Sequence, residues 1–140
     1  MRIRRYDASD EEQVIRLWQI SFPNDPPRNE PRSVIQRKLA VDPELFLVGE
    51  SSGRVIATAL GGYDGFRGWV YHLAITPERR REGLARQMMG QIEARLAARG
   101  CPKLNLQVRT SNAEVIAFYE SLGYSVEENV GMGKLLEGSQ

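Results

Sequence analysis

The sequence predicts a mixed α/β layer structure, and three stretches carry that prediction. Residues 45–50 and 54–60 are strand-like runs joined across Ser51-Ser52-Gly53, which is a hairpin signal. Residues 70–75 form another apolar run, which leads through a basic turn into a segment with helical spacing of apolar residues. Apolar and polar residues then alternate over 104–108, as in a half-buried strand. Strands and helices in this order favour a sheet covered by helices.

The order of these elements also predicts how the strands pair. The hairpin and a glycine-rich turn at 61–65 should give an antiparallel meander that ends in 70–75. The connection from 70–75 through the helix to 104–108 should be a right-handed parallel crossover. If those two strands splay where the helix begins, a crevice opens beyond their carboxyl ends, where open α/β sheets favour ligand sites.

Composition limits the class of protein. The 140 residues fit one domain, 1–140, and a formal net charge of +1 argues against a nucleic-acid binder held by bulk charge. No apolar run approaches the ~20 residues of a membrane span, and the first residues lack the apolar core of a signal peptide. The one cysteine, Cys101, permits no internal disulfide and is expected to be inert. We therefore expect a cytoplasmic protein without a membrane or nucleic-acid partner.

The N-terminal third predicts a strand, two helices and a restricted loop. Residues 2–6 indicate a short strand, and the capping-box pattern Ser9-x-x-Glu12 indicates a helix start. Residues 22–31 are crowded with proline and must form an irregular loop before a helix at about 33–40. This loop is either a specificity element for a substrate or a simple linker.

The stretch from Val70 to Ala85 is the centre of the functional prediction. Thr76-Pro77 stops the strand, three arginines follow at 79–81, and Gly83 precedes a helix that should end near Arg99. The first N–H groups of a helix have no partner within the helix, and they attract anions together with the helix dipole. A glycine at this point lets a ligand approach the backbone, so a diphosphate is the expected guest.

The C-terminal part predicts one more helix and two closing strands. Ser111-x-x-Glu114 is a second capping-box pattern, and the helix that it opens should stop at Gly123. Residues 124–126 and 130–136 are expected to be closing strands.

Two motifs resemble those of the GCN5-related N-acetyltransferases (the GNAT family). Arg80-x-x-Gly83-x-Ala85, after a strand ending Leu73-Ala74-Ile75, is similar to the acetyl-CoA signature Gln/Arg-x-x-Gly-x-Gly/Ala. NAEVIAFYESLGY at 112–124 resembles the second signature of the family. The resemblance covers about residues 2–136 and is closest to the bacterial YpeA-like and RimI-like branch. Arg81 departs from the pattern, since many members have glycine there.

The resemblance implies a fold, a cofactor and roles for individual residues. The fold would be a mostly antiparallel sheet with a splayed central parallel pair that forms a V-shaped crevice, flanked by about four helices. Main-chain groups of Leu73, Ala74 and Ile75 would bind the pantetheine arm and polarise the thioester carbonyl. Tyr119 would be the general acid for the departing thiolate of coenzyme A. The residues implied in cofactor binding are Leu73, Ala74, Ile75, Arg80, Arg81, Gly83, Leu84, Ala85, Asn112 and Tyr119, and no metal is implied.

The acceptor side stays open at this level. An alkyl ammonium must lose a proton before it attacks, and His72, with an ordinary pKa near ~6.5, suits a general base. In a regular strand Tyr71 and His72 point to opposite faces, and a bulge could exchange them. Glu50, Asp64 or proton removal through water without a dedicated residue are alternatives. The acceptor could be a small amine, an amino acid, an antibiotic or a peptide or protein amine.

The function predicted is acetyl transfer from acetyl-CoA to a primary amine by direct attack within a ternary complex. The sequence does not fix the oligomeric state, for which a homodimer is the commonest option. A non-catalytic CoA-responsive regulatory module is the alternative from another class. A nucleotide binder that uses the basic turn is a third, although the chain lacks the Lys-Ser/Thr pair of a P-loop after the glycine.

Overall fold

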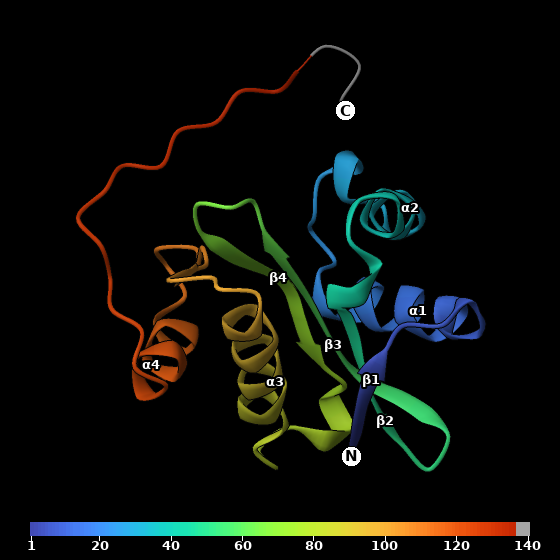
Figure 1. Ribbon diagram of the computed structural model, residues 1–140. Coiled ribbons are helices and arrows are strands. Elements are labelled where there is room, and N and C mark those ends of the chain that lie inside the picture. The colour runs from blue at the N-terminus through green and yellow to red at the C-terminus, as the bar shows by residue number, and fades with distance from the viewer. Residues whose placement is uncertain (137–140) are drawn as a thin grey trace. The chain divides into compact units, whose positions relative to one another are not determined.

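Five strands form one sheet in the order β1-β2-β3-β4-β5 (Figure 1). The computed structural model describes residues 1–136. Strands β1 to β4 pair antiparallel in succession, whereas β5 pairs parallel with β4. The bounds are Arg2–Arg5 (β1), Phe46–Ser51 (β2), Arg54–Tyr63 (β3), Gly68–Ile75 (β4) and Leu104–Asn105 (β5). The predicted hairpin, meander and parallel crossover are confirmed.

The parallel pair is joined over two residues only. Gly68 lies opposite Leu104 and Trp69 opposite Asn105, and no later residue of β4 is paired with β5 in the described chain. The strand expected at 104–108 therefore ends at Asn105. A β-bulge in β4 bends and twists this edge, and a straight parallel partner cannot follow it. Among the described residues, no strand pairs with the second half of β4 on the side of β5.

Helices cover both faces of the sheet. Figure 1 shows α1 and α2 on one side of the strands and α3 on the other. The α-helices of this part are Glu11–Ser21 (α1), Pro31–Val41 (α2) and Leu84–Ala98 (α3). Short 3-10 turns join the elements at Ala8–Asp10 (η1), Pro27–Asn29 (η2), Pro43–Leu45 (η3) and Pro77–Arg79 (η4).

The core lies between the sheet and these helices. One cluster joins α1 and α2 to one sheet face, and it contains Val14, Ile15, Leu17, Trp18, Val34, Ile35, Phe46, Val48, Val55, Leu60 and Ala74. The buried residues of α3 are Leu84, Met88, Met89, Ile92 and Leu96. Each buried aliphatic or aromatic side chain contributes about 1.5–3 kcal/mol. The sheet is thus held firmly where β3 and β4 pass between the two helical layers.

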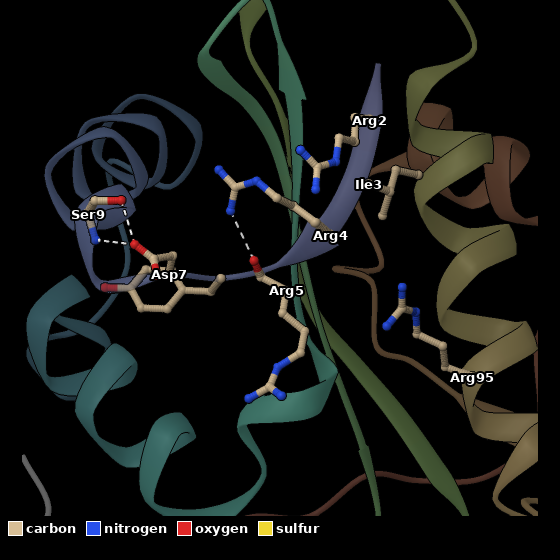
Figure 2. A pocket seen from close by; sticks show the side chains of 8 residues that line it. Arg2, Ile3, Arg4, Arg5, Asp7, Ser9 and Arg95 are labelled. Carbon is tan, nitrogen blue, oxygen red and sulfur yellow. Dashed lines mark hydrogen bonds between the residues drawn. The ribbon is translucent and has the colours of Figure 1, made fainter.

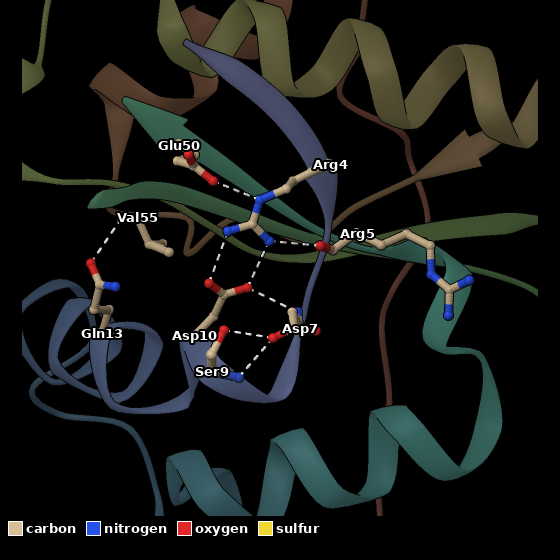
Figure 3. Close-up of polar contacts among 8 residues, drawn as sticks. All are labelled: Arg4, Arg5, Asp7, Ser9, Asp10, Gln13, Glu50 and Val55. Carbon is tan, nitrogen blue, oxygen red and sulfur yellow. Dashed lines mark hydrogen bonds and ion pairs between the residues drawn. The ribbon is translucent and has the colours of Figure 1, made fainter. Parts of the chain in front are cut away.

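A polar network fixes the entry into α1, and it corrects the predicted cap. Figure 3 shows the Arg4 guanidinium bonded to both carboxylate oxygens of Asp10, at 2.8 and 2.9 Å, and to Glu50 at 2.7 Å. The capping box is formed by Asp7 and Asp10 around η1, whereas Ser9 donates its hydroxyl to Asp7. The predicted Ser9 box does not form, because Asp7, two residues earlier, accepts from the N–H of Ser9 and caps η1 instead.

The contacts divide the chain into two compact units, Met1–Asn105 and a second unit that begins at Leu106. In its described residues, 106–136, the second unit contains one helix, Ala113–Ser121 (α4), whose cap Asn112 accepts from the N–H of Val115. Asn112 thus replaces the predicted Ser111, so that prediction was wrong by one residue. The prediction of a single domain, 1–140, stays a prediction.

The predicted closing strands do not form in the described residues. Neither 124–126 nor 130–136 is in a strand in the part of the chain that ends at Leu136. The segment carries two adjacent glutamates at 127–128 and glycines at 131 and 133. Glycine and acidic residues are depleted in strands because they pack poorly on a pleated surface, which accounts for the difference.

Within the described residues, none of the helices combines the length and the apolar character needed to span a bilayer.

Candidate active site

A β-bulge in the middle of β4 organises the site. Thr58 pairs with Ala74 and Leu60 with Tyr71, so Ala59 of β3 faces two residues of β4, His72 and Leu73. His72 takes up the extra residue with a φ of 52°, in the left-handed region. A non-glycine residue pays of order 1–3 kcal/mol for such a conformation, and such strain clusters at functional sites. The strand is thus not regular here: the bulge that the sequence left open lies at His72.

Buried hydrogen bonds hold the bulge in place. The Thr58 hydroxyl donates to the carbonyl oxygen of His72 at 2.9 Å, and it accepts from the indole Nε1 of Trp18 at 2.8 Å. Thr58 and Trp18 are almost completely buried, with exposed fractions of 0% and 2%. This chain of bonds ties α1 through β3 to β4, so the strained residue is fixed by the core on which it lies.

The imidazole of His72 lies among residues of α1 and of the loop after it. Its ring meets those of Trp18 and Phe22 edge to face, with centroids 4.6 and 4.9 Å apart. Its Nε2 is 3.9 Å from Oδ2 of Asp25, and its side chain is 14% exposed. Burial lowers the pKa of His72 below its usual 6.5, and the nearby Asp25 opposes that shift. The imidazole is therefore neutral at pH 7 and able to accept a proton.

A cavity of about 410 Å³ opens beside His72. It is formed by α1, the α1–α2 loop and β4, and no lysine or arginine of the described residues 1–136 lines it. The lining residues are Trp18, Gln19, Phe22, Pro23, Asp25, Pro26, Pro27, Asn29, Glu30, Pro31 and His72. The loop expected at 22–31 thus supplies most of a cavity wall, whereas the pairing of Asp25 with His72 is not visible in the sequence. The sequence feature that could have indicated this contact is an acidic residue, Asp25, within a proline-rich loop.

The basic turn lies at the other end of the same strand. Arg79 is held by the chain itself: its Nε donates to both oxygens of Glu82, at 3.0 and 2.9 Å, and its Nη1 donates to Ser51 at 3.1 Å. Arg80 and Arg81 are exposed. Of the three arginines, Arg80 and Arg81 are therefore the more exposed.

Helix α3 begins without a cap. Its N-cap residue is Gly83, which has no side chain to form a capping bond, and its first turn contains no acidic residue. Gly83 has a φ of 76°, and a Cβ built there would meet no other atom within 4 Å. The glycine is thus required by its backbone conformation or by a ligand, since no neighbouring protein atom would obstruct a side chain.

The backbone at Arg81 has the conformation of the glycine that the motif usually has there. Its φ is 67°, which glycine adopts freely and which costs an L-residue about 1–2 kcal/mol. The turn therefore keeps the geometry of a glycine there, and the N–H groups of the turn remain available. The donor set, which comprises the N–H groups at the start of α3 with the guanidinium groups of Arg80 and Arg81, fits a diphosphate.

The second unit carries the other predicted residues. The ring centroid of Tyr119 lies 5.1 Å from that of Phe118 and 5.7 Å from that of Tyr124. Burial raises the pKa of Tyr119 to about 12, so its hydroxyl stays protonated at neutral pH. Asn112 accepts from Val115 at 3.3 Å through its side-chain oxygen, which leaves its NH₂ group as a donor.

The two alternative bases lie outside the cavity. Glu50 pairs with Arg4, and Asp64 accepts from the N–H groups of Phe66 and Arg67 in its own turn. These bonds lower the pKa of Asp64, those of Arg67 and Phe66 most. Neither carboxylate lines the wall that contains His72.

A second hollow lies along β1 and contains no predicted site residue. Figure 2 shows the side chains around it, from β1, the turn after it and Arg95 of α3. Its volume is about 660 Å³, and its lining residues are Arg2, Ile3, Arg4, Arg5, Tyr6, Asp7, Ser9 and Arg95. Arg4 and Asp7 are already engaged in the network that caps η1. This hollow therefore belongs to the structural network of the N-terminus.

The fold, the cavity beside His72 and the basic turn at the other end of β4 suit a transferase that uses a diphosphate-bearing cofactor. Comparison with known proteins agrees: the model of the Acetyltransferase (GNAT) family matches residues 11–124. An acetyltransferase of Yersinia enterocolitica is 46% identical over 136 residues, which cover 97% of this chain and 96% of that protein.

Solved structures of the same fold match as well. Naa20 of Chaetomium thermophilum, in complex with a bisubstrate analogue, has a TM-score of 0.75 at 28% identity, covering 90% of this chain and 72% of that one. Ard1 of Thermoplasma volcanium has a TM-score of 0.81 at 25% identity, covering 90% and 83%.

The chain belongs to the acetyltransferase (GNAT) family. It is an acetyl-CoA-dependent N-acetyltransferase, and acetyl-CoA is its cofactor. The YpeA-like and RimI-like branch stays a prediction, as do the roles of the individual site residues.

Proposed function

We propose that this enzyme acetylates a primary amine by direct attack within a ternary complex. One observation carries the proposal: the β4 bulge joins a cavity that contains a neutral histidine to a free strand edge that leads to an uncapped helix start. The amine would enter on the side of His72, and the cofactor on the side of α3. The two reactants would then meet at Leu73, which directly follows the bulge.

The residues that would hold the cofactor lie in one continuous stretch. N–H groups at Arg81, Gly83, Leu84 and Ala85 would bind the diphosphate, assisted by the side chain of Arg80. The main chain of 73–75 has a free edge on the side of β5, so it can pair with an extended pantetheine arm. A main-chain N–H there would also polarise the thioester carbonyl, in the manner of an oxyanion hole. Acetyl-CoA supplies the acetyl group as an activated thioester.

His72 would accept the proton that the amine must lose. An amine with a pKa near ~10.4 is mostly protonated at pH 7, and freeing its lone pair costs about 4–5 kcal/mol. The reaction forms an N–C bond and breaks the C–S bond, and the nitrogen releases its protons as the amide forms. A neutral imidazole in the cavity can take such a proton directly or through one water.

Tyr119 would supply the proton to the departing sulfur. Its support is the motif at 112–124 and its own protonation, since a pKa of about 12 keeps the hydroxyl intact at any physiological pH. Protons balance: the ammonium loses two in all, one before attack and one as the amide forms, and His72 would pass both to solvent, whereas Tyr119 would give one proton to the sulfur and regain one from solvent. Asn112 would contact the cofactor through the NH₂ group that its capping bond leaves available.

Two variants test these roles by the release of the CoA thiol. His72→Asn keeps a residue that tolerates a positive φ, so the bulge should survive. Its kcat/KM should fall about 100-fold at pH 7 and less at pH 9, where the amine is deprotonated more often without help. A loss that is equal at both pH values would contradict the role as base and would favour proton removal through water.

Tyr119→Phe should lower kcat about 100-fold without weakening the affinity for CoA in calorimetry. Unchanged turnover would remove Tyr119 as the acid. If the wild-type enzyme bound no CoA at all, the whole proposed function would fall.

A further inference from the structure

The cavity beside His72 is negatively charged, and one of its carboxylates has almost no partner. Its lining contains Asp25 and Glu30 but no lysine or arginine, and burial keeps His72 neutral at pH 7. Glu30 is engaged elsewhere, because its two oxygens accept from the N–H groups of Arg32 and Ser33 at the start of α2. Asp25 is therefore the carboxylate to consider.

Asp25 lies close to the proposed base. Its Oδ2 is 3.9 Å from Nε2 of His72, and it accepts one long bond from Asn29, at 3.4 Å. No lysine or arginine forms an ion pair with it in the described residues 1–136. Its side chain is only 25% exposed, so water screens its charge only partly. A carboxylate in this position favours a cation in the cavity.

The reacting nitrogen cannot be the lasting partner of Asp25. It must be uncharged when it attacks, so the attraction to the carboxylate disappears at the moment of transfer. Only interactions that persist into the transition state raise kcat/KM. A second cationic group on the acceptor keeps its charge throughout, and its own field also lowers the pKa of the reacting ammonium nearby.

The other walls of the cavity indicate what joins the two charges. Trp18 and Phe22 present rings, and four prolines add apolar surface. Such walls suit a short chain of methylene groups. A carboxylate on the acceptor would face Asp25 with no cation to compensate it.

Resting on the proposed function, we propose that Asp25 selects a short aliphatic amine that carries a second cationic group and no carboxylate. Diamines are the simplest members of this class. Free amino acids are disfavoured, because their carboxylate would enter a negatively charged cavity.

Three acceptors with the same four-carbon chain test the inference: 1,4-diaminobutane, n-butylamine and 4-aminobutanoate. The kcat/KM for the diamine should exceed that for butylamine by about tenfold to 100-fold, which is the usual value of a charged hydrogen bond. Aminobutanoate should be the poorest. The preference should lie mainly in KM, since a positioning charge binds the acceptor before and during transfer.

Asp25→Asn should reduce the ratio of the diamine to butylamine to less than threefold. Glu30→Gln, which removes the same charge from the same cavity, should leave that ratio within threefold of the wild-type value. Calorimetry should show that diaminobutane binds to the wild-type enzyme with CoA but binds more weakly to Asp25→Asn.

Each outcome decides between the two proposals. Acetylation of butylamine or aminobutanoate as fast as that of the diamine would overturn the inference and leave the proposed function intact. So would a diamine preference that survives in Asp25→Asn. If CoA binds and none of the three amines is acetylated, the diamine class is excluded. If CoA does not bind, the proposed function itself fails.

Discussion

Helices α2 and α3 begin in opposite ways. At α2, Pro31 removes one donor, and the carboxylate of Glu30 accepts from the N–H groups of Arg32 and Ser33 at 3.1 and 2.9 Å. At α3, the N-cap residue Gly83 has no side chain, so it forms no capping bond. Both helices have about the same need for an acceptor, since each leaves its first N–H groups without an intrahelical partner. The side chain of Glu30 provides this acceptor at α2, whereas Gly83 provides none at α3 and leaves space for an anion.

This difference separates a structural from a functional helix start. A capped start contributes to stability and has no further capacity to bind. A start without a cap lowers the stability of the free protein, and its N–H groups stay able to bind an anionic ligand. Backbone strain adds a second cost to stability at this site. His72 and Arg81, which lie before and after 73–75, both have a positive φ.

The largest expected effect comes from making α3 begin as α2 does. Gly83→Asp would place a carboxylate where the diphosphate is expected, and two like charges about 4 Å apart repel with about 4 kcal/mol near a protein surface. Allowing for solvent screening, we expect the affinity for CoA to fall about 100-fold in calorimetry.

Gly83→Asn is the matched control, because it has the same size and tolerates a positive φ without the charge. It should weaken CoA binding much less, by about tenfold or under. Equal losses in the two variants would show that the negative charge does not meet the phosphates, and the comparison of the two helix starts would lose its functional meaning.

Features that depend on neighbouring residues were predictable from the sequence. The hairpin around Ser51-Ser52-Gly53, the turn at 79–83 and helix α3 all follow from local turn chemistry and apolar spacing. The uncapped start belongs to this group, since a glycine at the N-cap cannot offer an acceptor. The motifs at 80–85 and 112–124 then identified the family.

Features that depend on pairing between distant residues were not predictable from the sequence. The bulge exists because β4 has one residue more than β3 between two paired positions, which the sequence of β4 does not reveal. The contact of Asp25 with His72 joins residues of different elements. Competition among nearby acceptors also decided the caps, with Asp7 and Asn112 in place of Ser9 and Ser111.

A smaller effect is expected at Arg81, before the uncapped helix. Arg81→Gly removes about 1–2 kcal/mol of backbone strain and returns about 0.5–1 kcal/mol as added freedom of the unfolded chain. We expect the free energy of unfolding in urea to rise by about 0.5–1 kcal/mol. Arg81→Ala, which keeps the strain and loses the same charge, should bring no gain. If Arg81→Gly were less stable than Arg81→Ala by about 0.5–1 kcal/mol, the entropy difference alone, the turn would carry no strain at this residue.

The smallest effect is expected at the capped helix. Hydrogen bonds from the N–H groups of Ser33 and Arg32 lower the pKa of Glu30 below its usual 4.5. A carboxyl whose pKa is lowered on folding stabilises the protein above its unfolded pKa, and the stabilisation is lost as the pH falls through its folded pKa. Glu30→Gln should therefore lower the urea midpoint at pH 7 but not at pH 3. Glu128→Gln, which removes an exposed charge outside every described helix, should change neither, so a pH-independent loss in Glu30→Gln would show that shape, rather than charge, caps α2.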